Sequence, residues 1–277
     1  MFYDANGNMI PITDDRNDAL HSIDVTYERA NGTSYFLCRI PHESISGKRI
    51  LPHVALTSAS GSAGQNVNGA KVSALTYAKR EGTLFAINAG LFDMTKVVPL
   101  GQTVIDGVSV TNTPMTSDNG TPISAAECYP LCIDADGNLS APYDRSVDTA
   151  VMIADGVRYA VTGWGKLIDQ YEKCDKTVFD EIVHPGDYMQ QCIGQYDNGD
   201  YCVLTVNRAR NGQAENDIGM TYDEIADILI AKGVKFAYVL DGGGSTETVL
   251  GNRQINAIYE GEFGRAVPTV IRFDVAD

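Results

Sequence analysis

The sequence predicts an α/β (α+β) domain with a mixed β-sheet and packed helices, on three observations. Residues 221–241 combine a helix capping box, an apolar helical stripe, a stopping glycine and a buried strand. Residues 69–88 repeat this order of helix, glycine and strand. Two further segments, 133–139 and 196–201, have the Asp-Gly and Asn-Gly pattern of hairpin turns. We therefore expect one domain from residue 45 to 277, with helices at 69–81 and 221–232 packed against its sheet.

Residues 1–44 differ from the rest and are expected to form an amino-terminal β extension or adaptor. They contain an Asn-Gly hairpin turn, a polar connector and the strand-like run Ile23–Tyr27. The order Tyr3-Asp-Ala-Asn-Gly-Asn8 resembles linkers in phage tail and baseplate proteins. The alternative is a simple β extension that packs on the domain.

Composition restricts the partners of this chain. A formal net charge of −15 and a pI near 4.6 argue against binding to nucleic acid or to an anionic membrane surface. No apolar run reaches the roughly 18 residues of a membrane span, and no signal peptide is recognisable. We expect a soluble protein, and leave its oligomeric state and a virion-associated or secreted location open.

The first helix–strand unit ends in polar residues. Val72, Leu75 and Ala78 mark the helix, Gly82 ends it, and the strand 83–87 leads into Asn88. The stretch 94–126 is rich in Thr, Pro, Asn and Gly, and directly follows these polar residues. We expect it to form a cover over a site.

The second unit ends in an acid and three glycines. The strand 234–240 leads into Asp241 and Gly242–Gly244, where the backbone amides are expected to bind an anion. No Gly-Lys-Ser/Thr follows, which excludes an ordinary P-loop. If the two strands are neighbours, Asn88, Asp93 and Asp241 share one rim of the sheet. The alternative is a tight glycine turn at a strand end.

These segments resemble signatures of the phosphodiester glycosidase family. Ala86–Asp93 is similar to "AINGGFFD", and Leu240–Thr246 is similar to "LDGGGS". Three shorter matches occur in the same order as in the family, at 163–168, 218–221 and 265–268. The resemblance covers roughly residues 50 to 274.

The resemblance implies a hydrolase that cleaves the glycosyl–phosphate bond of a sugar-1-phosphodiester, such as an α-N-acetylglucosaminyl one. The leaving phosphate needs little acid assistance, whereas the oxocarbenium-like transition state needs a nearby carboxylate. The expected catalytic carboxylates are Asp241, Glu247 and Asp93, each with turn capping as the alternative. The expected substrate-binding residues are Asn88, Gly242, Gly243, Gly244, Ser245, Arg208, Arg210, Gln190 and Trp164. The expected ligand is a carbohydrate or glycosyl phosphate.

One residue departs from the family pattern. Where the family has an "RTAIG" segment, this chain has Gln190–Gly194, and glutamine cannot supply a cationic fork to phosphate. Arg208 or Arg210, just after the next strand, is expected to take that role. The departure favours a rival hypothesis, in which the chain is a non-catalytic carbohydrate-binding or structural module of a phage tail.

No cofactor or metal is expected. The four histidines are scattered singly, and the six cysteines are expected to be reduced, mostly buried thiols. A simple phosphatase is a second rival, but neither a two-metal ligand set nor a cysteine nucleophile loop is present in the sequence.

Overall fold

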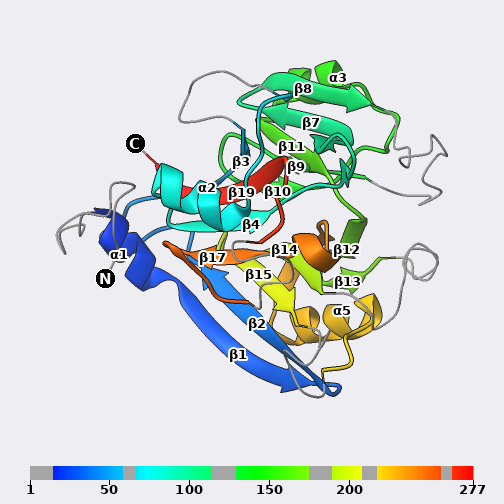
Figure 1. Ribbon diagram of the computed structural model, residues 1–277. Helices are drawn as coiled ribbons and strands as arrows, with labels where there is room; N and C mark the ends of the chain where they lie inside the picture. Colours follow the sequence, from blue (N-terminus) through cyan, green and yellow to red (C-terminus); the bar gives the residue numbers. More distant parts are fainter. Residues whose placement is uncertain are drawn as a thin grey trace.

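The computed structural model describes residues 15–58, 67–113, 129–174, 189–207, 217–256 and 264–276. It confirms the expected α+β class, with three main sheets and a few helices at the periphery (Figure 1). All pairs of neighbouring strands in the described residues are antiparallel.

The largest sheet has seven strands. Their spatial order is β1 (Asp24–Ala30), β2 (Thr33–Ile40), β15 (Tyr201–Val206), β14 (Gln190–Tyr196), β16 (Val234–Val239), β12 (Gly165–Asp169) and β13 (Glu172–Lys173). The hairpin expected around residues 196–201 is confirmed, because β14 and β15 pair in register. Helix α5 (Tyr222–Ala231) packs its apolar stripe against this sheet.

Two five-stranded sheets lie beside it. One has the order β18 (Arg253–Gln254), β17 (Thr248–Leu250), β4 (Phe85–Asn88), β19 (Thr269–Val275) and β3 (Ile50–Leu56). The other has the order β10 (Leu139–Ser140), β9 (Pro130–Ile133), β11 (Tyr159–Thr162), β7 (Gly101–Ile105) and β8 (Val108–Thr113). The remaining elements are α1 (Asp15–Ser22), α2 (Ala74–Glu81), α3 (Thr149–Ala154), the pair β5 (Phe92–Asp93) and β6 (Val98–Pro99), and the 3-10 turn η1 (Gly243–Ser245).

Both predicted helices form, and one begins later than predicted. The α5 capping box is present: Thr221 Oγ1 accepts from Glu224 N, and Glu224 Oε2 accepts from Thr221 N at 2.8 Å. Helix α2 begins at residue 74, not 69, because Ser73 is its N-cap and Val72 is held in a β-bridge. Gly82 ends α2 with φ +69°.

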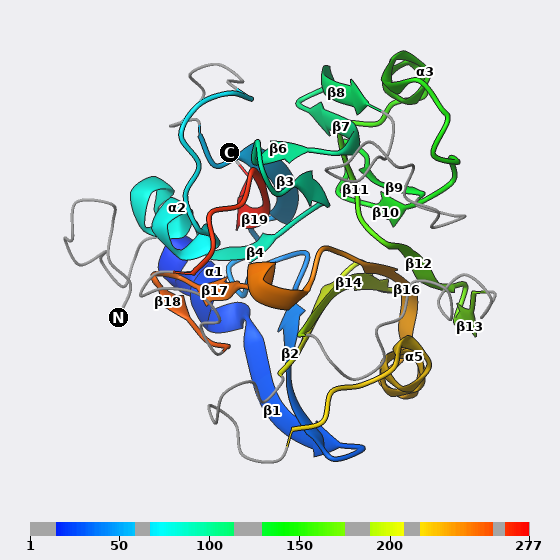
Figure 2. The ribbon, with the colours of Figure 1, turned by 45° about the vertical axis from the view of Figure 1, so that its right-hand side comes forward.

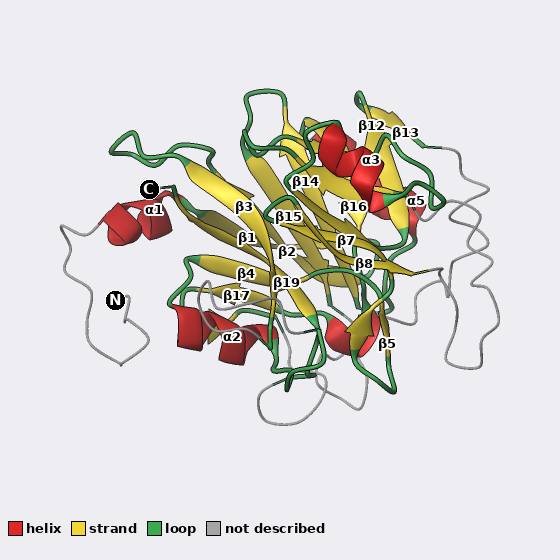
Figure 3. Ribbon diagram, turned by 90° about the horizontal axis from the view of Figure 1, so that it is seen from above, coloured by secondary structure: helices red, strands yellow, loops and turns green. Residues whose placement is uncertain are grey.

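A shared core joins the three sheets. Leu131, Val203 and Phe273, one from each sheet, belong to the same cluster of buried side chains. Figure 3 shows the sheets from above, with their strands stacked across this region. This shared cluster holds the three sheets at a fixed relative position.

The amino-terminal hairpin β1–β2 is continuous with the seven-stranded sheet. Strand β2 pairs with β15 along its length, and Cys38 and Ile40 are fully buried in the shared core. In Figure 1 this hairpin is the blue pair of strands along the lower edge. The division at residue 44 stays a prediction, and the adaptor segment 1–14 lies outside the described residues.

Candidate functional site

The two signature strands meet at their carboxyl ends although they belong to different sheets. Strand β4 lies in a five-stranded sheet and β16 in the seven-stranded one, so the two strands do not pair with each other. Asn88 Nδ2 nevertheless donates to Asp241 O at 2.7 Å, and Asp241 N donates to Ala89 O at 3.0 Å. The rim is therefore formed by a junction of two sheets, which Figure 2 shows around the orange 3-10 turn.

The glycines after Asp241 allow a close backbone approach. A Cβ atom on Gly242 would lie 2.8 Å from Met189 O, and Gly243 has φ +62°. The amide of Gly243 donates to Met189 O at 2.7 Å, and that of Ser245 donates to Gly242 O. Because these two amides are already used, the expectation that all amides from 242 to 245 bind an anion is corrected.

The Asp241 carboxyl group is half-buried beside this turn. Burial raises its pKa to about 6, against hydrogen bonds from the Ser245 hydroxyl and the Gly242 amide and the charge of Arg265, which lower it. A carboxylate with this pKa is ionised near neutral pH and remains close to titration. Such a group is suited to stabilising a positive charge that develops next to it.

The site contains a cation that the sequence reasoning did not assign. Arg265 Nη1 donates to Ser245 Oγ at 3.4 Å and contacts Met94 Sδ at 3.9 Å. Arg265 is the first residue of the motif 265–268, which contributed to the family resemblance. That motif was the one sequence feature that could have pointed to Arg265 as a site residue. Its proximity to Asp241 depends on β19 returning beside β4, which no local pattern shows.

Glu247 is buried and caps helix α2. Its side chain is 1% exposed, and Oε2 accepts from Leu75 N at 3.2 Å in the first turn of α2. Oε1 has no hydrogen-bond partner among the described residues, and a side chain at Gly264 would collide with it. Burial raises the pKa of Glu247 to about 7, against backbone hydrogen bonds that lower it. The geometry is that of a capping group, and a catalytic role for Glu247 stays a prediction.

We expect Glu247 to make stability depend on pH. Because its folded pKa of about 7 lies above the ordinary value of 4.5, protonation favours folding. This contribution is complete below about 4.5 and is lost as pH rises through 7. From pH 4 to pH 8 the free energy of unfolding should fall by about 2–3 kcal/mol more than in Glu247→Gln, measured by urea denaturation. The exposed Glu43→Gln is the matched control, and an equal slope in Glu247→Gln and the unsubstituted protein would contradict the expectation.

Asn88 connects the two acidic segments. Its side chain is 1% exposed, donates to Asp241 O and accepts from Glu247 N at 3.1 Å. A closed ring of buried side-chain hydrogen bonds joins the seven-stranded sheet to β17, and its members are Gln191, Thr205 and Thr248. These contacts position the Asp241 turn, and a direct contact of Asn88 with sugar stays a prediction.

Asp93 is the last residue of β5 and precedes the turn to β6. Its Oδ1 accepts from Thr95 N and from Lys96 N, both at 2.9 Å. These backbone hydrogen bonds lower the pKa of Asp93 despite its partial burial, and the bond from the Lys96 amide has the largest effect. Asp93 therefore caps a turn in this structure, and a catalytic role stays a prediction.

Gln190 lies next to the glycine turn. Its Cα would be 3.7 Å from a Cβ atom on Gly242, and its buried Oε1 has no hydrogen-bond partner among the described residues. Trp164 is half-buried and packs against the core cluster between α5 and the seven-stranded sheet. Stacking of Trp164 on a sugar stays a prediction. Arg208 and Arg210 lie outside the described residues.

The described part of the chain has no group of three or more His, Cys, Asp or Glu side chains arranged to hold a metal. The five described cysteines are unbridged, and four of them are buried. None of the described helices is long and apolar enough to cross a membrane.

The fold and the site define a β-rich α+β domain with a carboxylate-bearing glycine turn at a junction of two sheets. The sequence profile of the family "Phosphodiester glycosidase" matches residues 81–273. The chain belongs to this family.

Known proteins resemble the chain in sequence and in fold. An uncharacterized SPbeta prophage-derived protein of Bacillus subtilis (strain 168), YomE, is 28% identical over 207 residues, which cover 73% of this chain and 30% of that protein. The zebrafish N-acetylglucosamine-1-phosphodiester alpha-N-acetylglucosaminidase catalytic domain, auto-inhibited by its pro-peptide, has a TM-score of 0.65 at 21% identity, covering 92% of this chain and 82% of that one. A hypothetical protein from Synechocystis has a TM-score of 0.59 at 15% identity, covering 92% and 62% respectively. At these identities the two structures show the fold alone.

Proposed function

We propose that this protein hydrolyses the glycosyl–phosphate bond of a sugar-1-phosphodiester, for example one with an α-N-acetylglucosaminyl group. The observation that supports this most is the meeting of Asp241 and Arg265 across Ser245. A carboxylate and a guanidinium at one strand end match the two charges of the transition state, a sugar cation and a departing phosphate anion.

In this proposal, water attacks the anomeric carbon and the bond from that carbon to the phosphate oxygen breaks. The electron pair leaves with the phosphomonoester, which needs little protonation, and the proton lost by the attacking water is released to solvent. Asp241 stabilises the developing positive charge, and Arg265 binds the phosphate. The unpaired Oε1 of Gln190 accepts a hydroxyl or amide N–H of the sugar, which would satisfy a buried acceptor.

The test is turnover of a synthetic glycosyl-1-phosphodiester in isotopically labelled water. We expect free sugar and a phosphomonoester, with the label on the sugar because the carbon–oxygen bond breaks. Label on the phosphate would show a phosphodiesterase. The absence of turnover for several sugars would favour the non-catalytic module.

Loss of the guanidinium should weaken anion binding. Arg265→Met keeps much of the side-chain length and removes the charge, so affinity for inorganic phosphate should fall by about 10–100-fold. Isothermal titration calorimetry at low salt measures this, with the exposed Arg253→Met as the matched control. Equal phosphate affinity in both variants would remove Arg265 from the phosphate site.

A carbohydrate-binding or structural module of a phage tail is the second candidate function. It is favoured by the replacement of an arginine by Gln190 and by the relative that derives from a prophage. The chain spans only 30% of that relative's length. This module would bind the sugar phosphodiester without producing phosphomonoester.

A further inference from the structure

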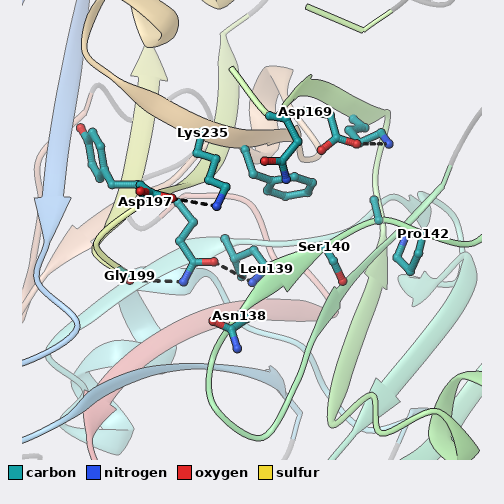
Figure 4. A pocket seen from close by; sticks show the side chains of 14 residues that line it. Asn138, Leu139, Ser140, Pro142, Asp169, Asp197, Gly199 and Lys235 are labelled. Carbon is teal, nitrogen blue, oxygen red and sulfur yellow. Dashed lines mark hydrogen bonds and ion pairs between the residues drawn. The ribbon is translucent and has the colours of Figure 1, made fainter. Parts of the chain in front are cut away.

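A polar cavity lies at the opposite end of β16 from Asp241. It has a volume of about 330 Å³, within the range of small-molecule sites, and lies between the β9–β10 turn, β12 and the β14–β15 turn (Figure 4). Lys235, near the start of β16, lines this cavity, whereas Asp241 follows the end of the strand. Six extended residues span roughly 20 Å, so the cavity is separate from the candidate active site.

The walls of the cavity are held together by Gln195. Its Oε1 accepts from Leu139 N at 2.9 Å, and its Nε2 donates to Gly199 O at 3.2 Å. One side chain on β14 thereby ties the β9–β10 turn to the β14–β15 turn. Because these bonds involve backbone atoms, the shape of the cavity is present before any ligand binds.

Two ion pairs line the cavity, and each of them joins one positive and one negative side chain. Lys166 Nζ lies 2.6 Å from Asp169 Oδ2, and Lys235 Nζ lies 2.8 Å from Asp197 Oδ1. Figure 4 shows Asp197 and Lys235 joined by a dashed line, with Asp169 also among the lining residues. Each ammonium has three N–H donors and each carboxylate about four lone pairs, so both pairs retain donors and acceptors. Neighbouring hydroxyls of a neutral ligand match this arrangement.

Apolar side chains complete the lining. Phe236 and Pro142 contribute surface beside the ion pairs. A pyranose ring presents both hydroxyls and a face of C–H bonds, and therefore matches both kinds of lining.

We propose that this cavity is a second, non-catalytic binding site for a neutral pyranose sugar. A zwitterion such as a free amino acid fits less well, because its charges would compete with ion pairs that are already formed. The proposal does not depend on the reaction proposed above, since none of the lining residues belongs to the Asp241 turn.

The test is a titration of the isotopically labelled 277-residue protein, followed by amide NMR shifts. The probes are glucose, galactose and N-acetylglucosamine, each at millimolar concentration. We expect at least one sugar to shift the amides of Gln195, Gly199 and Lys235, while those of Gly242–Ser245 do not follow the same binding curve. Glycine at equal concentration is the zwitterion control.

Substitutions inside and outside the cavity should differ in their effect on sugar affinity. Asp197→Ala removes an exposed carboxylate and should weaken sugar binding about tenfold. Asp227→Ala also removes an exposed carboxylate paired with a lysine, Lys173, but lies outside the cavity and should leave binding unchanged. Asp169→Ala is the second test variant if Asp197→Ala does not fold.

Three outcomes would overturn the proposal. No shift of the cavity amides with any of the three sugars would exclude the pyranose. Equal shifts with glycine would identify a zwitterion site instead. Shifts confined to Gly242–Ser245 would mean that sugar binds only at the candidate active site, which would leave the proposed reaction intact.

Discussion

The Asp241→Asn protein is expected to turn over a sugar-1-phosphodiester at least about 100-fold more slowly than the unsubstituted protein at neutral pH. The substitution keeps the shape of the side chain and removes the charge. A carboxylate that stabilises an oxocarbenium-like transition state lowers the activation free energy by about 3 kcal/mol or more, and its loss raises the barrier by the same amount. Steady-state release of phosphomonoester measures the change.

The same residue should set the acidic limb of the pH profile. The pKa of Asp241 is raised to about 6, so the active carboxylate form is lost as pH falls through 6. The raised pKa also means that the neutral form favours folding, so Asp241→Asn should unfold no more easily than the unsubstituted protein at pH 8. A structural Asp241 would show the opposite, with lost stability and nearly normal turnover per folded molecule.

The matched control is Asp106→Asn. Asp106 is exposed and lies in the turn between β7 and β8, away from the Asp241 turn. It accepts a hydrogen bond from Tyr159 Oη. We expect its turnover to remain within about twofold of the unsubstituted protein, since surface changes seldom exceed 0.5 kcal/mol. Equal losses in both variants would point to a general effect on folding.

Asn88→Ala should have the largest effect on stability. It removes the donor to Asp241 O and the acceptor for Glu247 N, leaving a part-buried carbonyl and a buried amide unpaired. The buried amide costs about 1–3 kcal/mol and the part-buried carbonyl about 1 kcal/mol, so we expect a loss of about 2–4 kcal/mol and a melting temperature lower by roughly 5–15 °C. Chemical denaturation and calorimetry measure the loss.

Turnover of Asn88→Ala should also fall, because the Asp241 turn loses its tie to β4. The exposed Asn112→Ala, which removes one surface hydrogen bond to Asp148, is the control. It should change stability by less than about 0.5 kcal/mol. A stable Asn88→Ala protein with reduced affinity for sugar would instead support the direct sugar contact predicted from the sequence.

Local chemistry in the sequence determined much of the molecule. The Thr221–Glu224 capping box, the Gly82 and Gly233 helix ends and the 196–201 turn each depend on contacts between near neighbours, and the structure has all of them. The resemblance of the two glycine-bearing strand ends also identified the family, which the profile match shows.

Only the tertiary structure decided how the site is assembled. Asn88 and Asp241 lie together, as the shared rim requires, but their strands pair with other strands in different sheets. Antiparallel pairing is set by long-range registers that a local pattern does not contain. The same is true of Arg265, which β19 carries to the Asp241 turn. The tertiary structure also sets the pKa values of Asp241 and Glu247. Burial raises both pKa values, and this desolvation depends on atoms contributed by distant segments.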